Sequence, residues 1–82
     1  MKYQTIINKC KEAFNNNSLE LASKYFYKMH NKLKREEAKL DKDDYEGKHL
    51  LFRKFAVYMR QFTDKEVYTI TDYLKEKYYK KI

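Results

Sequence analysis

The stretch that decides the fold prediction is His49 to Phe62, whose sequence is HLLFRKFAVYMRQF. At about 100° of rotation per residue, it puts apolar side chains on almost every side of a helix. One side carries a continuous stripe of Leu51, Phe55, Tyr58 and Phe62, and the other sides add Leu50, Phe52, Val57 and Met59. A helix that is apolar nearly all round must be covered on several faces. The stretch therefore predicts the central helix of a small helical bundle.

The rest of the composition favours helices as well. The chain has 82 residues, no proline and one glycine, and Asn, Asp, Ser or Thr makes nearly every break between apolar-periodic segments. Strand and hairpin signals are essentially absent. A chain of this length has room for one core only. We therefore expect an all-α fold, a small antiparallel four-helix bundle, in a single domain spanning residues 1–82.

Two helices are predicted before the central one. The segment from Tyr3 to Phe14 has one narrow apolar face made of Tyr3, Ile6, Ile7, Cys10 and Phe14. Three asparagines, residues 15–17, end it, since asparagine tolerates left-handed backbone geometry. A long helix from Ser18 to about Leu40 follows, capped by Ser18 or by Asn17, and with Asn17 as the cap Glu20 takes the third position of a capping box. Its apolar face is made of Ala22, Phe26, Met29, Leu33 and Leu40.

An acidic loop and a short turn border the central helix. Residues 41–48 are expected to be a long loop with Gly47 as its flexible point, and its aspartates also suit the amino terminus of the next helix. After Phe62, Thr63 and Glu66 form the pattern of a capping box that opens a fourth helix, Asp64 to about Lys80. Because that turn is very short, the last two helices are expected to pack as antiparallel neighbours.

The charge of the chain favours an anionic partner. Nineteen Lys or Arg residues against twelve Asp or Glu give a net charge of +7, spread over both halves of the sequence. A generally positive surface suits nucleic acid, anionic lipid or an acidic protein. One line of cations at helical spacing runs along the second helix through Lys24, Lys28, Lys32, Arg35 and Lys39. Such a stripe is suited to phosphate contact. In a lysine-rich protein, however, it is more often a solvated helix face.

No catalytic or metal signature is present in the sequence. Cys10, His30 and His49 do not stand at metal-ligand spacing, and Cys10 is expected to be a small buried hydrophobe. The acidic loop fails the EF-hand pattern, because position 5 counted from Asp41 is Tyr45 and position 12 is Phe52. A single glycine excludes a glycine-rich phosphate loop. The prediction is a protein that is not an enzyme, with no cofactor, no metal and no small-molecule substrate.

The last helix carries the candidate partner-binding residues. Nine tyrosines are many for this length, and tyrosine beside lysine is suited to a protein interface or a membrane headgroup zone. The candidates are Tyr68, Tyr73, Lys75, Lys77, Tyr79, Lys80 and Lys81. Tyr27 also lies off the apolar stripes, whereas Tyr25, Tyr58 and Tyr78 are expected in the core. Exposed tyrosines that are merely scattered would serve no partner.

Several features point to the cytoplasm. The amino terminus lacks the apolar run of a signal peptide, and no stretch approaches the roughly 20 apolar residues of a membrane span. The single cysteine fits a reducing compartment. The oligomeric state stays open.

The order of the helices resembles that of the bacteriocin immunity proteins of the enterocin A and pediocin class. The resemblance covers about residues 18 to 80, through Leu33 with the charged run 34–39, the stretch 50–58, and Phe62 to Glu66 leading to Ile70 and Leu74. It implies a cytoplasmic antiparallel four-helix bundle that protects its producer by binding a membrane receptor already engaged by the bacteriocin. Recognition would be concentrated in the carboxyl-terminal half.

Three functions therefore stand side by side at this stage. The first is a protein-binding immunity module, acting at the membrane surface on a receptor–bacteriocin complex. The second is a small basic nucleic-acid-associated protein of phage or mobile-element origin, which the net charge and the stripe of the second helix favour. The third is an inhibitor of a larger host protein.

Overall fold

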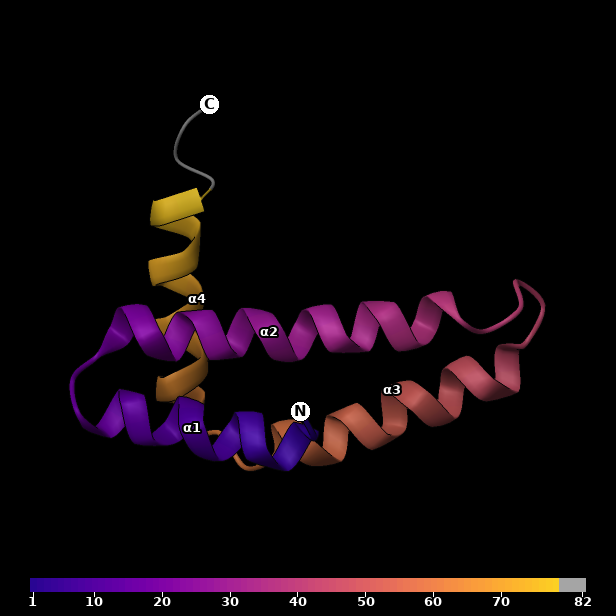
Figure 1. Cartoon of the computed structure of the whole chain (residues 1–82), viewed down its shortest axis with the longest axis horizontal. Helices are drawn as coiled ribbons and strands as arrows, with labels where there is room; N and C mark the ends of the chain where they lie inside the picture. Colours follow the sequence, from indigo (N-terminus) through magenta and orange to yellow (C-terminus); the bar gives the residue numbers. More distant parts are fainter. Residues whose placement is uncertain (79–82) are drawn as a thin grey trace.

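The computed structural model describes residues 1–78, with Tyr78 described by its backbone alone, and this part consists of four helices and no strand (Figure 1). The helices are α1 (Tyr3–Asn15), α2 (Leu19–Ala38), α3 (Tyr45–Met59) and α4 (Asp64–Tyr78). The fold class predicted from the sequence, an all-α four-helix bundle, is confirmed.

The longest helix, α2, organises the other three. With 20 residues it is long enough for α1 and α3 to lie one after the other along it, each antiparallel to α2 (Figure 1). The chain then turns sharply, and α4 crosses behind the amino-terminal half of α2 (Figure 1). Because α4 packs mainly on α2, the expectation that α3 and α4 would be antiparallel neighbours is wrong.

The core lies where α1, α2 and α4 meet. Ile7, Met29 and Ile70, one from each of these helices, are among the most deeply buried side chains of the molecule. The predicted apolar faces of the first two helices are confirmed, although Phe14 is only half-buried and Leu40 lies beyond the end of α2. The buried apolar side chains are Tyr3, Ile6, Ile7, Cys10, Ala13, Ala22, Phe26, Met29, Leu33, Phe62 and Ile70.

The predicted central position of the third helix is wrong. No residue of α3 is buried, and its stripe residues Leu51 and Phe55 are only half-covered. Leu50 and Val57 are each 56% exposed and Phe52 is 46% exposed. The reason is the arrangement of the helices, because α1 and α4 both gather at the other end of α2. Among the described helices, α2 and the first turn of α1 are the ones that mainly cover α3.

In the turn between α1 and α2, the predicted helix end at the asparagines is confirmed, whereas the predicted capping box is not. Asn17 adopts a left-handed backbone with a φ of 60°, and the Ser18 amide donates a hydrogen bond of 2.9 Å to the Ala13 carbonyl. This bond satisfies one of the carbonyls that the end of α1 leaves without a helical partner. Ser18, not Asn17, is the N-cap of α2, and its side chain makes no capping hydrogen bond. The capping box proposed for Asn17 and Glu20 is therefore wrong.

The connection before α3 is shorter than predicted. The helix begins at Tyr45 instead of His49, and Asp44 caps it by accepting a hydrogen bond of 2.8 Å from the Gly47 amide. The predicted role of the aspartates at a helix amino terminus is thus confirmed for Asp44. Gly47 is not a flexible loop point, because it lies in the first turn of α3 with a negative φ.

The turn into α4 is fixed by the predicted capping box. The Thr63 amide donates to Glu66 Oε1 at 2.8 Å, and the Glu66 amide donates to Thr63 Oγ1 at 3.1 Å. Lys11 of α1 forms an ion pair of 3.2 Å with the same carboxylate. Burial by itself raises the pKa of Glu66, but the hydrogen bonds from Thr63 and Lys11 outweigh it, and the net pKa lies below its ordinary value. Glu66 therefore joins α1 to the start of α4.

Candidate binding surfaces

A cleft separates α2 from the part of α4 that extends beyond it. Its volume is about 580 Å³, within the range of small-ligand sites. The wall from α2 consists of Phe26, Tyr27, His30 and Lys34, and the wall from α4 consists of Thr71, Leu74 and Lys75. The surface of the cleft is thus largely aromatic and aliphatic, with one cation on each wall.

The floor of the cleft is held in place by His30. Its Nδ1 lies 2.9 Å from the Phe26 carbonyl oxygen, and its ring packs 4.7 Å from the Phe26 ring and 5.2 Å from the Phe55 ring, centroid to centroid. Because a carbonyl oxygen only accepts hydrogen bonds, Nδ1 is the nitrogen that carries the hydrogen. The floor is therefore already ordered without a ligand.

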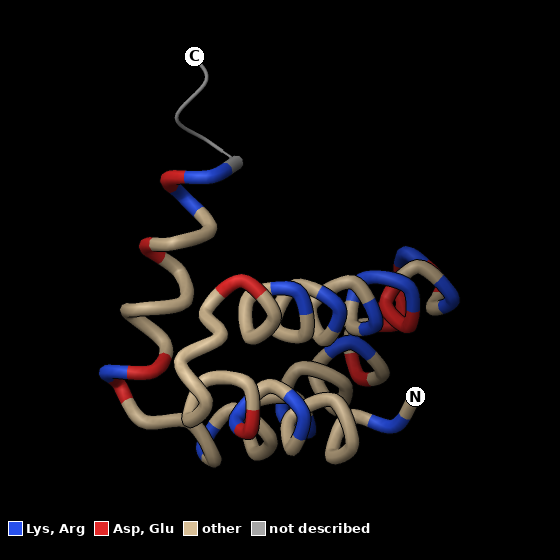
Figure 2. The backbone as a smooth tube through the Cα atoms, turned by 60° about the vertical axis from the view of Figure 1, so that its left-hand side comes forward, with Lys and Arg blue, Asp and Glu red and all other residues tan. Residues whose placement is uncertain are grey.

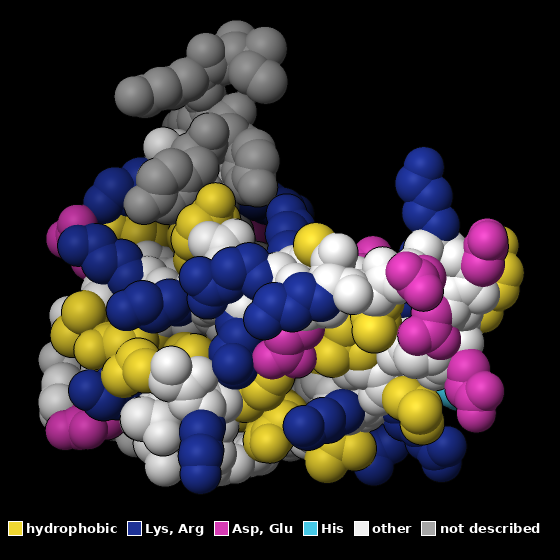
Figure 3. Space-filling view, turned by 45° about the vertical axis from the view of Figure 1, so that its right-hand side comes forward, with side chains coloured by type: hydrophobic (Ala, Val, Ile, Leu, Met, Phe, Trp, Pro, Cys, Tyr) yellow, Lys and Arg dark blue, Asp and Glu magenta, His cyan; other side chains and the backbone are white. Residues whose placement is uncertain are grey.

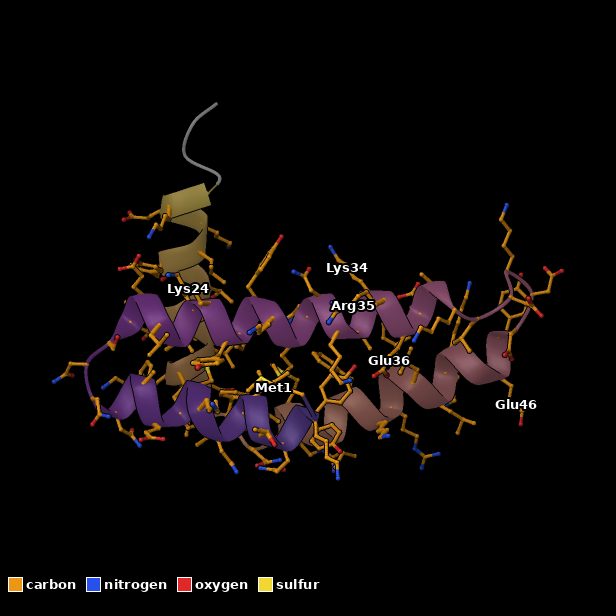
Figure 4. All side chains as sticks on the ribbon, in the orientation of Figure 1. Met1, Lys24, Lys34, Arg35, Glu36 and Glu46 are labelled. Atoms are coloured by element: carbon orange, nitrogen blue, oxygen red, sulfur yellow. The ribbon has the colours of Figure 1, made fainter. Side chains whose placement is uncertain are left out.

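The two lysines of the cleft come from positions that the sequence does not connect. Lys34 and Lys75 are both exposed, and within the described part of the chain neither ammonium pairs with a carboxylate. In Figure 4, Lys34 extends from α2 toward the side on which α4 protrudes, whereas Glu36 points into the space between α2 and α3. Sequence reasoning missed this cleft, although Phe26, His30 and Lys34 at four-residue spacing do indicate one of its walls.

A second candidate surface is the outer side of α3. Leu50 and Val57 stand two helical turns apart on the same side, with Arg53 and Lys54 between them. All four side chains are exposed. Figure 3 shows a face of the molecule on which Lys and Arg side chains alternate with exposed hydrophobic ones.

The structure divides the residues predicted as a partner-binding surface on the last helix. Tyr73 and Lys77 share one side of α4, where the Lys77 ammonium bonds Glu20 Oε1 at 2.9 Å and lies 5.6 Å from the Tyr73 ring centroid. Tyr68, 70% exposed, and Lys75 lie seven residues apart on a different side. The set therefore does not form one surface. The remaining candidates, Tyr79, Lys80 and Lys81, lie outside the described residues, as does the side chain of Tyr78.

The structure does bring the basic stripe of α2 together on one side of that helix. Lys24, Lys28, Arg35 and Lys39 are exposed, whereas Lys32 pairs with Glu36 at 3.3 Å and lies 5.2 Å above the Tyr3 ring. Figure 2 shows Lys and Arg positions recurring along α2 and also on the other helices. The positive charge is accordingly spread over the molecule and is not confined to this stripe.

The cysteine, histidines and acids of the described residues are not grouped as a metal site requires. Among the described residues, no group of three or more such side chains is close enough to hold a metal ion. Cys10 is 1% exposed, as predicted, and its thiol lies 3.2 Å from the Ala22 carbonyl oxygen. Burial and the nearby charge of Glu66 raise the pKa of Cys10 to about 11, so the thiol stays protonated and unreactive at neutral pH.

Comparison with known proteins adds no functional assignment. No family model matches the chain, and no curated protein or solved structure matches it. None of the helices in the described part of the chain is long and apolar enough to cross a membrane.

Proposed function

We propose that this chain is a non-enzymatic binding protein that uses the outer side of α3 to contact a protein partner. The observation that carries the proposal is that α3, the helix whose sequence is apolar nearly all round, has no buried residue. Large apolar side chains gathered on an exposed surface between polar ones are typical of protein interaction sites. Leu50 and Val57, each 56% exposed, are the apolar side chains of that side that a partner would cover.

The charges on the same side define the partner further. Arg53 and Lys54 lie between Leu50 and Val57, so the matching surface has carboxylates between its apolar contacts. A second copy of this chain fits poorly, because it brings a net charge of +7 and its own Arg53 and Lys54 to the contact. An acidic protein of a different kind is therefore the partner that the charges favour.

The specific form that we propose is immunity against a bacteriocin of the class IIa type, exerted from the cytoplasm on a receptor already engaged by the bacteriocin. Its support is the order and length of the four helices together with the exposed α3, which lies in the carboxyl-terminal half of the chain. A cytoplasmic location agrees with the reduced, buried thiol of Cys10. Inhibition of a larger host protein would use the same surface.

Expression of the full chain in a strain sensitive to class IIa bacteriocins tests this form. We expect higher tolerance with the native chain, and the double variant Leu50→Gln/Val57→Gln should abolish it. Tyr68→Ser, which alters an even more exposed side chain on α4, is the matched control and should keep protection. If no bacteriocin of a panel is tolerated better, the immunity form is wrong. If Tyr68→Ser alone abolishes protection, the partner binds to the surface of α4 and not to that of α3.

The oligomeric state tests the preference for a different partner. Light scattering behind size exclusion should show a monomer at micromolar concentration for the native chain and for Leu50→Gln/Val57→Gln. A concentration-dependent dimer that the double variant abolishes would instead assign α3 to self-association and contradict the argument from charge.

One observation supports nucleic-acid binding as a second candidate, namely the exposed cations of the stripe on α2. Phosphate contacts release counterions, so this function predicts micromolar affinity for a DNA or RNA fragment that falls steeply with salt. The double variant Lys24→Gln/Lys28→Gln should then reduce both the affinity and the salt slope. No gel shift at low salt would eliminate this function.

A further inference from the structure

We infer that the cleft between α2 and α4 is a binding site for a small anionic amphiphile, a molecule with an apolar body and one carboxylate or similar head group. This site is independent of the α3 surface and goes beyond the proposed function. It is built from residues that lie more than 35 positions apart in the sequence and come from two different helices.

The shape of the cleft suits a small molecule. Its volume of about 580 Å³ falls in the range of roughly 300–1,000 Å³ that drug-sized ligands occupy. In the described part of the chain, helices α2 and α4 wall it, so a ligand enters without unfolding any of the contacts described above. A docked helix of a partner protein would need a longer groove of apolar anchors than these two walls provide.

The lining of the cleft accounts for the apolar body of the ligand. In the α2 wall, Phe26 is 4% exposed and Tyr27 is 56% exposed, and in the α4 wall Leu74 is half-buried. The α2 wall is already ordered around His30, because one hydrogen bond to the Phe26 carbonyl and contacts with the Phe26 and Phe55 rings fix the imidazole ring. A ligand therefore loses little affinity to ordering the protein.

The two lysines account for the anionic head. Lys34 and Lys75 each bring an ammonium to the cleft from a different helix, and in the described part of the chain no carboxylate neutralises either one. Two like charges facing one cleft repel each other, and an anion bound between them removes that repulsion. By contrast, the other lysine of α4 that reaches α2, Lys77, already pairs with Glu20. Charge complementarity at the cleft thus selects an anion.

Titration of the full ¹⁵N-labelled chain with octanoate and decanoate, followed by amide chemical shifts, tests the site. We expect saturable shifts confined to the cleft, at Phe26, Tyr27, His30, Thr71 and Leu74, with decanoate binding more tightly than octanoate. The matched alcohol, 1-octanol, carries no charge and should bind at least about fivefold more weakly than octanoate.

Variants then distinguish the effect of the two cleft lysines on binding from the effect of the overall positive charge. Lys34→Gln and Lys75→Gln should each weaken decanoate binding by about two- to fivefold, because each removes one solvent-exposed charge contact. Lys39→Gln on α2 and Lys65→Gln on α4 make the same charge change outside the cleft and should leave the affinity unchanged. All four side chains are exposed, so the variants should fold, which circular dichroism would verify.

Three results would overturn the inference. The first is a set of shifts centred on Leu50 and Val57 of α3, which would place the amphiphile on the other surface. The second is equal affinity for octanoate and octanol, or for the cleft variants and their controls. The third is an acidic amphipathic peptide that shifts the cleft residues when the fatty carboxylates do not. Failure here would leave the bacteriocin assay, which depends on Leu50 and Val57, unaffected.

Discussion

The two ends of the molecule place their large apolar side chains in very different surroundings. In the body, where α1, α4 and the first half of α2 meet, Ile7, Met29 and Ile70 are almost completely buried. In the arm, residues 34–54, which comprises the end of α2, the connection and most of α3, no side chain is buried. The arm also contains large apolar side chains, among them Leu50, Leu51 and Phe52. The number of helices that meet at a point, and not apolar content alone, decides what is buried.

The largest expected effect is the difference in stability between truncating a side chain in the body and truncating one in the arm. Ile7→Ala should lower the free energy of unfolding by about 2–5 kcal/mol, because it opens a cavity in a packed core. Leu50→Ala in the arm should change it by no more than about 0.5 kcal/mol. Urea unfolding followed by far-ultraviolet circular dichroism measures both. Comparable losses for the two variants would mean that a partner or a second copy covers α3 in solution.

The carboxylate that joins α1 to α4 should have the next largest effect. Glu66→Gln removes the ion pair to Lys11 and weakens the capping box, so we expect a loss of about 1–3 kcal/mol at pH 7. The folded state lowers the pKa of Glu66, so folding favours its charged form. That contribution is complete above the ordinary value of 4.5 and is lost as pH falls through the lower folded pKa.

The acid dependence provides the control for this prediction. Unfolding midpoints measured from pH 7 down to acid should fall less steeply for Glu66→Gln than for the native chain, because the variant has no charge to lose at this position. Parallel curves for the two proteins would show that Glu66 does not contribute through its charge.

A smaller and more local loss of stability is expected at the N-cap of α3. Asp44→Ala removes the cap on the Gly47 amide and should cost about 1 kcal/mol, while Asp43→Ala, whose side chain makes no such bond, should cost almost nothing. Because the arm has few buried contacts, hydrogen exchange should accelerate in the first turns of α3 and not at Ile7 or Ile70. Uniform acceleration over all four helices would show that the arm and the body open together.

The smallest effect is expected at the exposed pair between α4 and the start of α2. Lys77→Gln breaks the bond to Glu20, but both side chains are well exposed, so the unfolding midpoint should stay unchanged at physiological salt. Lys11→Gln, which breaks the better-buried pair to Glu66, should lower it. If Lys77→Gln proves the more destabilising variant, the position of α4 on α2 depends on this surface contact.

The features that the sequence predicted correctly are local ones. The capping box of Thr63 and Glu66, the end of α1 at the asparagines and the buried position of Cys10 all depend on residues within a few positions of each other. The apolar face of α1 was also predictable, because one narrow stripe can be buried in only one way. The central position of α3 was not, since an all-round apolar pattern tells how much surface is available to cover but not which helices reach it.

The cleft was beyond sequence reasoning for a related reason. Lys34 and Lys75 become neighbours of one cavity only because α4 crosses α2 steeply instead of lying beside α3 (Figure 1). Helix periodicity alone places Tyr73 and Lys77 on a different side of α4 from Tyr68, and the crossing turns that side toward Glu20. Helix periodicity fixes the sides of α4, but the crossing direction is a property of the whole packing.

The aromatic cluster at the junction of α1 and α3 gives this protein a built-in optical reporter. The Tyr3 ring is 5% exposed, and its centroid lies 5.1 Å from that of Tyr58 and 6.0 Å from that of Phe55. Burial and the Glu36 carboxylate raise the pKa of Tyr3 from 10.0 to about 12, so on alkaline titration its phenolate should form only well above the ordinary range for tyrosine. Because the chain has no tryptophan, its near-ultraviolet circular dichroism comes chiefly from such fixed tyrosines. A thermal melt followed by near-ultraviolet circular dichroism therefore reports on the contact between α1 and α3. The far-ultraviolet melt of the same sample reports on every helix.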